Sequence, residues 1–197
     1  GSGGGGGGGG DSVSRPTLVG ALLGHGVRAV ACGAAHSVAV TRRGRCLTWG
    51  LGGSGQLGLG EGSGGGWFSG VPREVAGLAA EVVQGVACGY GHTVALTRGG
   101  ALFAWGWNRD GQLGVADTTN RHAPVRVGGL PPMQHVACGG GHSAAVTSDG
   151  DVYCCGSNAC GQLGLAAGAA GVRAAGSGSG SGTGGEGGGG GGDGSAE

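Results

Sequence analysis

The chain has 197 residues, of which 58 are glycine, and its 11 Lys and Arg residues balance its 11 Asp and Glu residues. A formal net charge of zero excludes the basic surface of a general nucleic-acid or anionic-membrane binder. The sequence has neither a run of about eighteen apolar residues nor a charged-then-apolar leader. We therefore expect no membrane span and an intracellular location, cytoplasmic or nuclear.

The two ends of the chain are dominated by glycine. Residues 1–10 are all glycine except Ser2, and residues 176–194 are glycine interrupted by Ser, Thr, Glu and Asp. Such segments have almost no side chains to bury and the largest backbone entropy to lose on folding. We expect disordered tails at residues 1–12 and 171–197.

The middle of the chain contains a threefold repeat. The segment 30–41, Val-Ala-Cys-Gly-Ala-Ala-His-Ser-Val-Ala-Val-Thr, recurs at 86–97 and 136–147. Two further motifs, Trp-Gly at 49–50 and Gly-Gln-Leu-Gly at 55–58, recur in the same register, although the third copy has Cys155 in place of the tryptophan. These anchors define repeats over residues 16–60, 71–115 and 123–165.

Each repeat has the pattern of short strands. In the first copy, residues 36–41 are small or apolar on both faces, a glycine-containing turn follows, and residues 46–49 form a second apolar run. A further strand candidate precedes each Val-Ala-Cys-Gly segment, at residues 16–19, 71–75 and 123–127. Four short strands per repeat predict an all-β fold, a partial β-propeller of about three four-stranded blades.

The motifs resemble the repeats of the regulator-of-chromosome-condensation family. The resemblance covers residues 16–165 and implies a propeller whose complete members have seven blades. Some members are guanine-nucleotide exchange factors for a small nuclear GTPase, and others are interaction domains of ubiquitin ligases, kinases, ciliary proteins or a plant ultraviolet-B photoreceptor. The photoreceptor function depends on tryptophans between Cys-Gly and His, and the matching residues here, 34–35, 90–91 and 140–141, include none.

Most of the chemically notable side chains occupy equivalent positions in the repeats, which favours a structural role. We expect the cysteines to be small buried hydrophobes rather than metal ligands, and the histidines to bond neighbouring backbone carbonyls. A serine next to a histidine in one strand points to the opposite face, which excludes a Ser-His nucleophile within a repeat. We expect no enzyme activity, no cofactor and no metal. The structural positions are Cys32, His36, Trp49, Cys88, His92, Trp105, Cys138 and His142.

Recognition is expected at residues that the repeats do not share. Trp67 and Phe68 lie in a glycine-rich insertion, and the loop that starts at Trp107 combines an aromatic with an arginine. Exposed aromatic and Arg side chains are favoured contact residues in protein interfaces. The candidate binding residues are Trp67, Phe68, Trp107, Asn108, Arg109 and Asp110.

Two functions fit this sequence. The first is a non-catalytic protein-interaction module, and the alternative is a guanine-nucleotide exchange factor or regulator for a small GTPase, although no wedge-like hairpin insertion is present. Three blades leave two open apolar faces. We therefore expect the chain to belong to a longer protein, to self-associate through these faces, or to be marginally stable.

Overall fold

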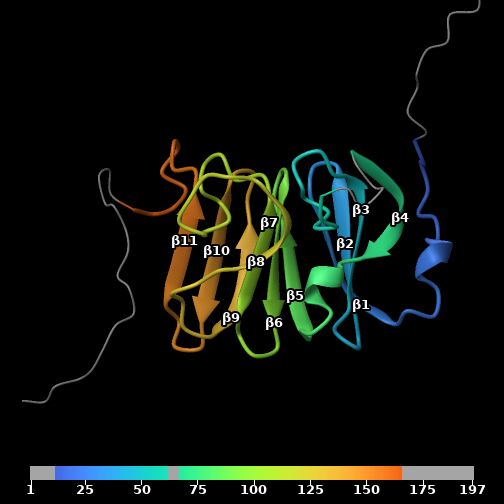
Figure 1. Cartoon of the computed structure of the whole chain (residues 1–197), viewed down its shortest axis with the longest axis horizontal. Helices are drawn as coiled ribbons and strands as arrows, with labels where there is room; N and C mark the ends of the chain where they lie inside the picture. The colour runs from blue at the N-terminus through green and yellow to red at the C-terminus, as the bar shows by residue number, and fades with distance from the viewer. Residues whose placement is uncertain (1–11, 62–66, 166–197) are drawn as a thin grey trace, which may run out of the picture.

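The computed structural model describes residues 12–61 and 67–165, which form three antiparallel sheets stacked side by side (Figure 1). The predicted tails at 1–12 and 171–197 lie almost entirely outside the described residues. The first sheet is β1 (Val27–Cys32), β2 (His36–Thr41), β3 (Cys46–Leu51) and β4 (Phe68–Glu74). The second is β5 (Val83–Cys88), β6 (His92–Thr97), β7 (Leu102–Gly106) and β8 (Arg121–Arg126), and the third is β9 (Met133–Cys138), β10 (His142–Thr147) and β11 (Val152–Gly156).

Within each sheet the strands follow chain order, and each pairs antiparallel with the next. The hairpins β2–β3, β6–β7 and β10–β11 turn through glycines with φ between 80° and 89°, a conformation that side chains with a Cβ rarely adopt. Only short 3₁₀ turns, Gly20–Leu22 (η1) and Ala76–Leu78 (η2), interrupt the all-β pattern of the described residues. None of the helical segments in this part of the chain is long and apolar enough to cross a membrane.

In the first two sheets, the outer strand comes from the sequence that follows the hairpin. Residues 71–75 and 123–127 overlap β4 and β8, but these strands pair with β3 and β7 of the preceding repeat. Residues 16–19 form no strand, so the predicted grouping of the outer strand with the following repeat is wrong. The connection over residues 52–67 brings the chain back to the free edge of β3, where β4 pairs antiparallel. The described part of the third sheet has three strands.

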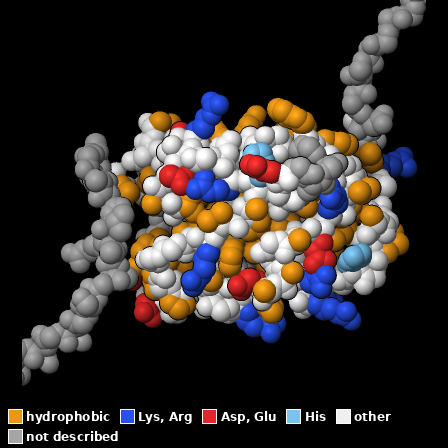
Figure 2. Space-filling view, viewed as in Figure 1, with side chains coloured by type: hydrophobic (Ala, Val, Ile, Leu, Met, Phe, Trp, Pro, Cys, Tyr) orange, Lys and Arg blue, Asp and Glu red, His pale blue; other side chains and the backbone are white. Residues whose placement is uncertain are grey.

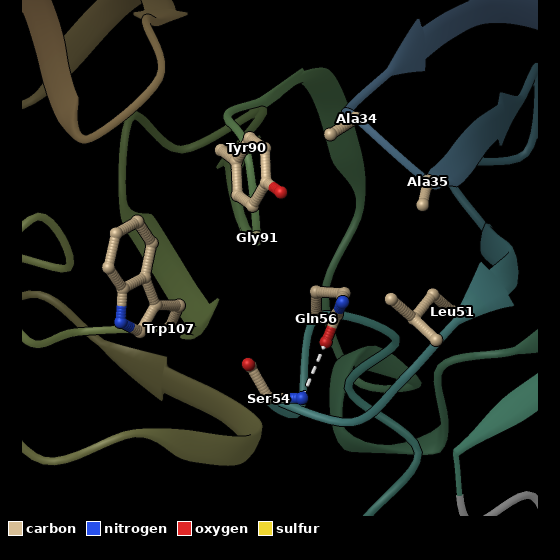
Figure 3. Close-up of a pocket in the computed structure, with 8 residues that line it drawn as sticks. All are labelled: Ala34, Ala35, Leu51, Ser54, Gln56, Tyr90, Gly91 and Trp107. Carbon is tan, nitrogen blue, oxygen red and sulfur yellow. Dashed lines mark hydrogen bonds between the residues drawn. The ribbon is translucent and has the colours of Figure 1, made fainter.

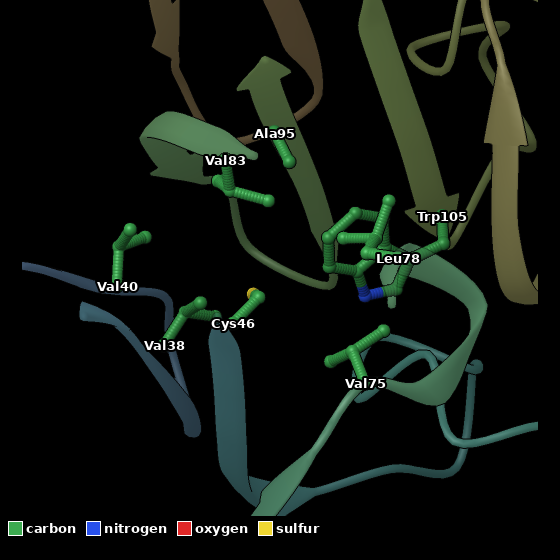
Figure 4. Close-up of a cluster of buried hydrophobic side chains, with 8 residues drawn as sticks. All are labelled: Val38, Val40, Cys46, Val75, Leu78, Val83, Ala95 and Trp105. Carbon is green, nitrogen blue, oxygen red and sulfur yellow. The ribbon is translucent and has the colours of Figure 1, made fainter. Parts of the chain in front are cut away.

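The sheets pack face to face. Strand β5 contacts β1 and β2, and β9 contacts β5 and β6. Between the first two sheets, Val38 and Val40 face Val83 and Ala95, and the same cluster includes the Trp105 ring, which lies beside Leu78 (Figure 4). A second cluster, which includes Leu102, joins the second and third sheets. Because both faces of β6 are covered, all six of its residues are buried. This stack is a partial β-propeller, as predicted.

Candidate functional site

The repeated histidines lie at the boundaries between blades. His36 Nε2 of the first blade is 2.9 Å from Thr93 Oγ1 of the second, and His92 Nε2 is 2.9 Å from Ser143 Oγ of the third. The Thr93 hydroxyl donates to the main-chain oxygen of Gln56 over 3.0 Å, and the Ser143 hydroxyl makes the equivalent bond over 2.7 Å. We call each such chain of bonds the histidine relay.

The relay assigns the proton on each ring. Because the Thr93 hydroxyl gives its hydrogen to the Gln56 carbonyl, its oxygen must accept from His36, which therefore carries its proton on Nε2. Nδ1 of His36 and of His92 is buried without a hydrogen-bond partner among the described residues. Burial lowers the pKa of His36 to about 4, and burial followed by the charges of His36 and His142 lowers the pKa of His92 to about 4. Both rings are thus neutral at pH 7.

The relay bears on two expectations from the sequence, the bonding partners of the histidines and the exclusion of a Ser-His contact. The prediction that the histidines bond neighbouring backbone carbonyls is corrected for Nε2 of His36 and His92, which meets a hydroxyl of the next blade that in turn donates to a carbonyl. A Ser-His contact is absent within a repeat but present between repeats, where stacking of the blades brings it about. Since His92 donates to Ser143 rather than accepting from it, the pair has the wrong polarity to activate a nucleophile.

The repeated tryptophan and glycine positions complete the blade boundary. Trp105 is fully buried, and its Nε1 donates to Gln56 O over 2.9 Å, the same oxygen that the relay uses. Its indole lies against Gly58, where a Cβ would stand 2.7 Å from Nε1. In the third blade, Cys155 replaces the indole and lies 3.4 Å from the Gln112 oxygen. Trp49 of the first blade is only half-buried.

The cysteines do not converge on a metal site. Cys46 is buried, and burial, with a smaller effect of Glu74, raises its pKa to about 12. Burial likewise raises the pKa of Cys88 and of Cys138 to about 12, whereas Cys32 is exposed. Among residues 12–61 and 67–165, no group of three or more His, Cys, Asp or Glu side chains could hold a metal ion.

Loops at one rim of the first two blades enclose an open hollow of about 190 Å³ (Figure 3). The Tyr90 and Trp107 rings stand on one side of it, edge to face, with centroids 6.2 Å apart and planes at 66°. Tyr90 is 67% exposed. The other side is formed by apolar residues of the first blade, and the Ser54 N–H donates to Gln56 Oε1 at its base. The lining residues are Ala34, Ala35, Leu51, Ser54, Gln56, Tyr90, Gly91 and Trp107.

The structure places the predicted binding residues in different surroundings. Trp107 lines the hollow, and Arg109 and Asp110 are exposed further along the same loop. Trp67 and Phe68 lie outside the hollow, 79% and 67% exposed, and the insertion that precedes them lies partly outside the described residues. The Trp67 ring covers Gly53, within the loop that contributes Leu51 and Ser54 to the hollow.

The predicted binding role of Asn108 is wrong. Its side chain is fully buried, and Nδ2 donates to Asp117 O and Thr119 O over 2.8 and 3.1 Å, while Oδ1 accepts from Leu113 N over 3.0 Å. Asn108 therefore fixes the loop rather than meeting a partner. Sequence reasoning missed Tyr90, whose signal was a bulky side chain between Gly and His where the other repeats have alanine or glycine.

Charge does not mark a binding face on the view in Figure 2, where arginine and acidic side chains are interspersed. The ion pairs Arg45–Glu74 and Arg121–Asp117 are local contacts within a blade. Exposed pairs of this kind contribute little to stability.

Known proteins share this architecture. The chain is 40% identical over 112 residues to the ultraviolet-B receptor UVR8 of Arabidopsis thaliana, and 42% identical over 107 residues to human protein RCC2. The matches cover 57% and 53% of this chain but 24% and 20% of those relatives, so the chain spans about a quarter or less of their length.

Solved structures of other proteins have a fold similar to that of this chain. Human WBSCR16 superposes with a TM-score of 0.61 at 33% identity, covering 66% of this chain and 33% of that one. Yeast RCC1 (Prp20), solved in complex with Kap60, gives 0.62 at 25% identity, covering 68% and 32%. The model of the regulator of chromosome condensation (RCC1) repeat matches residues 43–96 and 99–146, and a second model of this repeat matches 27–56, 82–112 and 134–162. From its repeats, its stacked blades and these matches, the chain belongs to the RCC1 repeat family.

Proposed function

We propose that the chain is a non-catalytic protein-interaction module, and that its partner binds at the hollow beside Tyr90 and Trp107. The observation that carries this proposal is the pair of aromatic rings held edge to face at an open rim. Rigid aromatic side chains supply a large contact area at a low cost in conformational entropy and are enriched among the residues that dominate interfaces.

The rest of the molecule supports this assignment by elimination. His36 and His92 with their partner hydroxyls Thr93 and Ser143 are used in the relay, where each ring donates its proton to the hydroxyl instead of removing one from it. Leu51 is 44% exposed at the edge of the hollow and adds apolar area opposite the rings. A partner side chain with an aliphatic stem could lie between Leu51 and Tyr90, with its polar end near Ser54.

Relatives suggest two probes for a partner. The structure of yeast Prp20p is described together with its binding to Gsp1p and to histones, and it superposes on this chain with a TM-score of 0.60 at 26% identity. We therefore propose purified core histones and a small GTPase of the Gsp1p type as test partners. An intracellular location, cytoplasmic or nuclear, fits either of them and stays a prediction.

The test is a comparison of two variants with matched exposure. Tyr90 and Phe68 are each 67% exposed, but only Tyr90 lines the hollow. Affinity for each probe is measured by biolayer interferometry. We expect Tyr90→Ala to weaken binding by at least about tenfold and Phe68→Ala to leave it unchanged. Loss of binding in Phe68→Ala alone would move the site to β4, and failure of the unmodified chain to bind either probe would contradict the proposal.

The alternative, guanine-nucleotide exchange, is favoured by the likeness to Prp20p alone. An exchange factor destabilises bound nucleotide by binding the nucleotide-free GTPase more tightly. Release of a fluorescent guanine nucleotide at substoichiometric amounts of this chain would replace the non-catalytic proposal. An unchanged release rate, with binding retained, is the result we expect.

A further inference from the structure

The hollow between the first two blades has an equivalent at the second blade boundary, because the repeats place the same positions at both. Gln112 there corresponds to Gln56, and Asp110 corresponds to Ser54. The backbones also match, since the Ser54 N–H donates to Gln56 Oε1 over 2.9 Å and the Asp110 N–H donates to Gln112 Oε1 over 3.0 Å. The second boundary therefore shows what the repeat itself places where the first boundary has the hollow.

A carboxylate of the chain lies at the second boundary. A Cβ on Gly141 of the third blade would stand 3.3 Å from Asp110 Oδ2 and 3.6 Å from Ser157 Cβ. The Asp110 side chain thus reaches from a loop of the second blade to the surface of the third. Because Gly141 has no side chain, it leaves the room that this carboxylate takes.

The first boundary lacks this carboxylate. Gly91 corresponds to Gly141, and the atoms of the described chain within 4 Å of a Cβ at Gly91 both belong to Trp107, at 3.4 and 4.0 Å. Ser54 does not reach this point, because its side chain is shorter than that of aspartate and ends in a hydroxyl. Since Gly91 and Ser54 both line the hollow, its open space includes the place that the Asp110 carboxylate fills at the second boundary.

The lining of the hollow offers hydrogen-bond donors. The Ser54 N–H fixes the Gln56 amide by its oxygen, so the hydrogens on Gln56 Nε2 are left for another acceptor. Figure 3 shows Tyr90 directing its hydroxyl from the side of the rings toward the first blade, and Ser54 directing its own toward the side of the rings. No hydrogen bond joins Gln56 Nε2 or either hydroxyl to another residue of the described ranges.

A carboxylate is the group that fits these donors. Its oxygens only accept hydrogen bonds, and bonds to a charged acceptor are stronger than bonds between neutral groups. None of the eight lining residues is acidic, so no lining side chain repels a negative charge. A Lys or Arg side chain, in contrast, would bring further donors to a site whose amide oxygen already accepts the Ser54 N–H.

The two boundaries differ in the access to the glutamine amide. Gln112 Nε2 is buried without a hydrogen-bond partner among the described residues, and Asp110, which comes from the same loop, does not bond it. Gln56 borders an open hollow, so a side chain that enters from solvent can approach its amide. Glutamate has one methylene more than aspartate, and this extra reach suits it to the deeper donor.

We propose that the hollow binds an acidic side chain of the partner, with its carboxylate at the place that Asp110 fills at the second boundary. The aliphatic part of this side chain lies between Leu51 and Tyr90, and the carboxylate accepts from Ser54 and Gln56. This inference rests on the proposed function, because it names the chemistry of the partner at the same site.

The test measures the binding of peptides that differ in one side chain. The probes are acetyl-Gly-Leu-Glu-Leu-Gly-amide and its versions with Gln or Lys in place of Glu. Each is titrated into the ¹⁵N-labelled chain, and the amide shifts in NMR spectra give the site and the affinity. We expect the Glu peptide to shift Ser54, Gln56 and Tyr90. It should bind at least about fivefold more tightly than the Gln peptide and about tenfold more tightly than the Lys peptide.

A substitution taken from the second repeat tests the place of the carboxylate. Ser54→Asp brings the side chain of the second boundary into the first, and like-charge repulsion should weaken binding of the Glu peptide by at least about tenfold. Ser148→Asp adds the same charge at the exposed hairpin between β10 and β11, and as the matched control it should leave the affinity unchanged. Ser54→Ala removes only the hydroxyl and should weaken binding by about threefold, which keeps the test decisive if Ser54→Asp unfolds.

Several results would overturn the acidic partner. Equal affinity of the Glu and Gln peptides would do so, as would a Lys peptide that binds at least as tightly as the Glu peptide. Absence of binding by all three peptides, or equal weakening by Ser54→Asp and Ser148→Asp, has the same meaning. The proposed function is contradicted by a different result, in which Tyr90→Ala leaves the binding of both protein probes unchanged. The two failures can therefore be told apart.

Discussion

His36 and Thr93 are 57 residues apart in the sequence, and the His36 Nε2 atom donates to the Thr93 hydroxyl over 2.9 Å across a blade boundary. The same bond joins His92 to Ser143 at the next boundary. At each boundary the hydroxyl in turn donates to the main-chain oxygen of a glutamine, Gln56 or Gln112. Trp105 Nε1 donates to the same Gln56 oxygen at the first boundary. The polar residues of the repeat thus hold neighbouring blades together.

Removal of a buried relay histidine should destabilise the fold more than removal of the terminal one. His92→Ala loses a buried hydrogen bond and leaves a cavity, and we expect a cost of about 2–4 kcal/mol. His142→Ala, which makes no relay bond in the described chain, should cost less than about 1 kcal/mol. Urea unfolding at low protein concentration measures both, and equal losses would contradict the relay.

Stability should fall as pH is lowered from about 6.5 to about 4. The pKa of His36 and of His92 is lowered to about 4 in the folded chain, so between these limits the unfolded chain binds more protons than the folded one. Each ring can contribute on the order of 3 kcal/mol over this window. Above pH 6.5 this contribution is fully present and stays constant.

The matched variant for this pH effect is His92→Gln, which keeps a nitrogen donor for Ser143 but does not titrate. The slope of unfolding free energy against pH should decrease by up to about 1.4 kcal/mol per pH unit between pH 4.5 and 6. An unchanged slope, measured by urea unfolding at several pH values, would mean that His92 is not neutral in the folded chain.

Two glycines with the same backbone conformation should respond differently to alanine. Gly58 and Gly164 both have φ of 67°, but a Cβ at Gly58 would collide with the Trp105 indole, whereas Gly164 has open space. Both substitutions cost about 1–2 kcal/mol of backbone strain. Gly58→Ala should cost a further 1–3 kcal/mol or so for overpacking. Thermal unfolding of the pair tests this, and equal melting temperatures would contradict it.

Cysteine reactivity should follow position in the blade. Cys46 is buried, and its pKa of about 12 leaves almost no thiolate near neutral pH, so it should resist N-ethylmaleimide in the folded chain. Cys32 and Cys160 are exposed and should be modified first. Mass spectrometry of peptides after timed labelling gives the order, with guanidinium-unfolded protein as the control. Labelling of Cys46 at the rate of Cys160 would contradict the assigned packing.

The sequence was sufficient to predict the fold because the repeat carries both its strand pattern and its turns. Apolar runs with glycine turns at residues 44 and 100 define hairpins, and repetition implies equivalent sheets. The pairing of the outer strand was not predictable in the same way. Residues 71–75 have a strand pattern wherever they pair, and only the free edge of β3 decides their partner.

The site was predicted less completely than the fold. Trp107 was identified because an aromatic side chain interrupts the repeat, but the same reasoning included Asn108, whose burial depends on the loop through Asp117 that wraps over it. The bond between His36 and Thr93 depends on how the blades stack, which a pattern within one repeat does not contain. Tyr90 is a bulky aromatic residue at a position where the other repeats have alanine or glycine. This irregularity indicates a binding residue, but the sequence analysis used the position only to show that no tryptophan is present.

The protonation of the relay histidines is tested most directly by ¹⁵N NMR of the imidazole rings at pH 5.5 and 7. We expect His36 and His92 to be neutral at both pH values, with the proton on Nε2 and no proton on Nδ1. Titration of either ring near its ordinary pKa of about 6.5, or a proton on Nδ1, would contradict it.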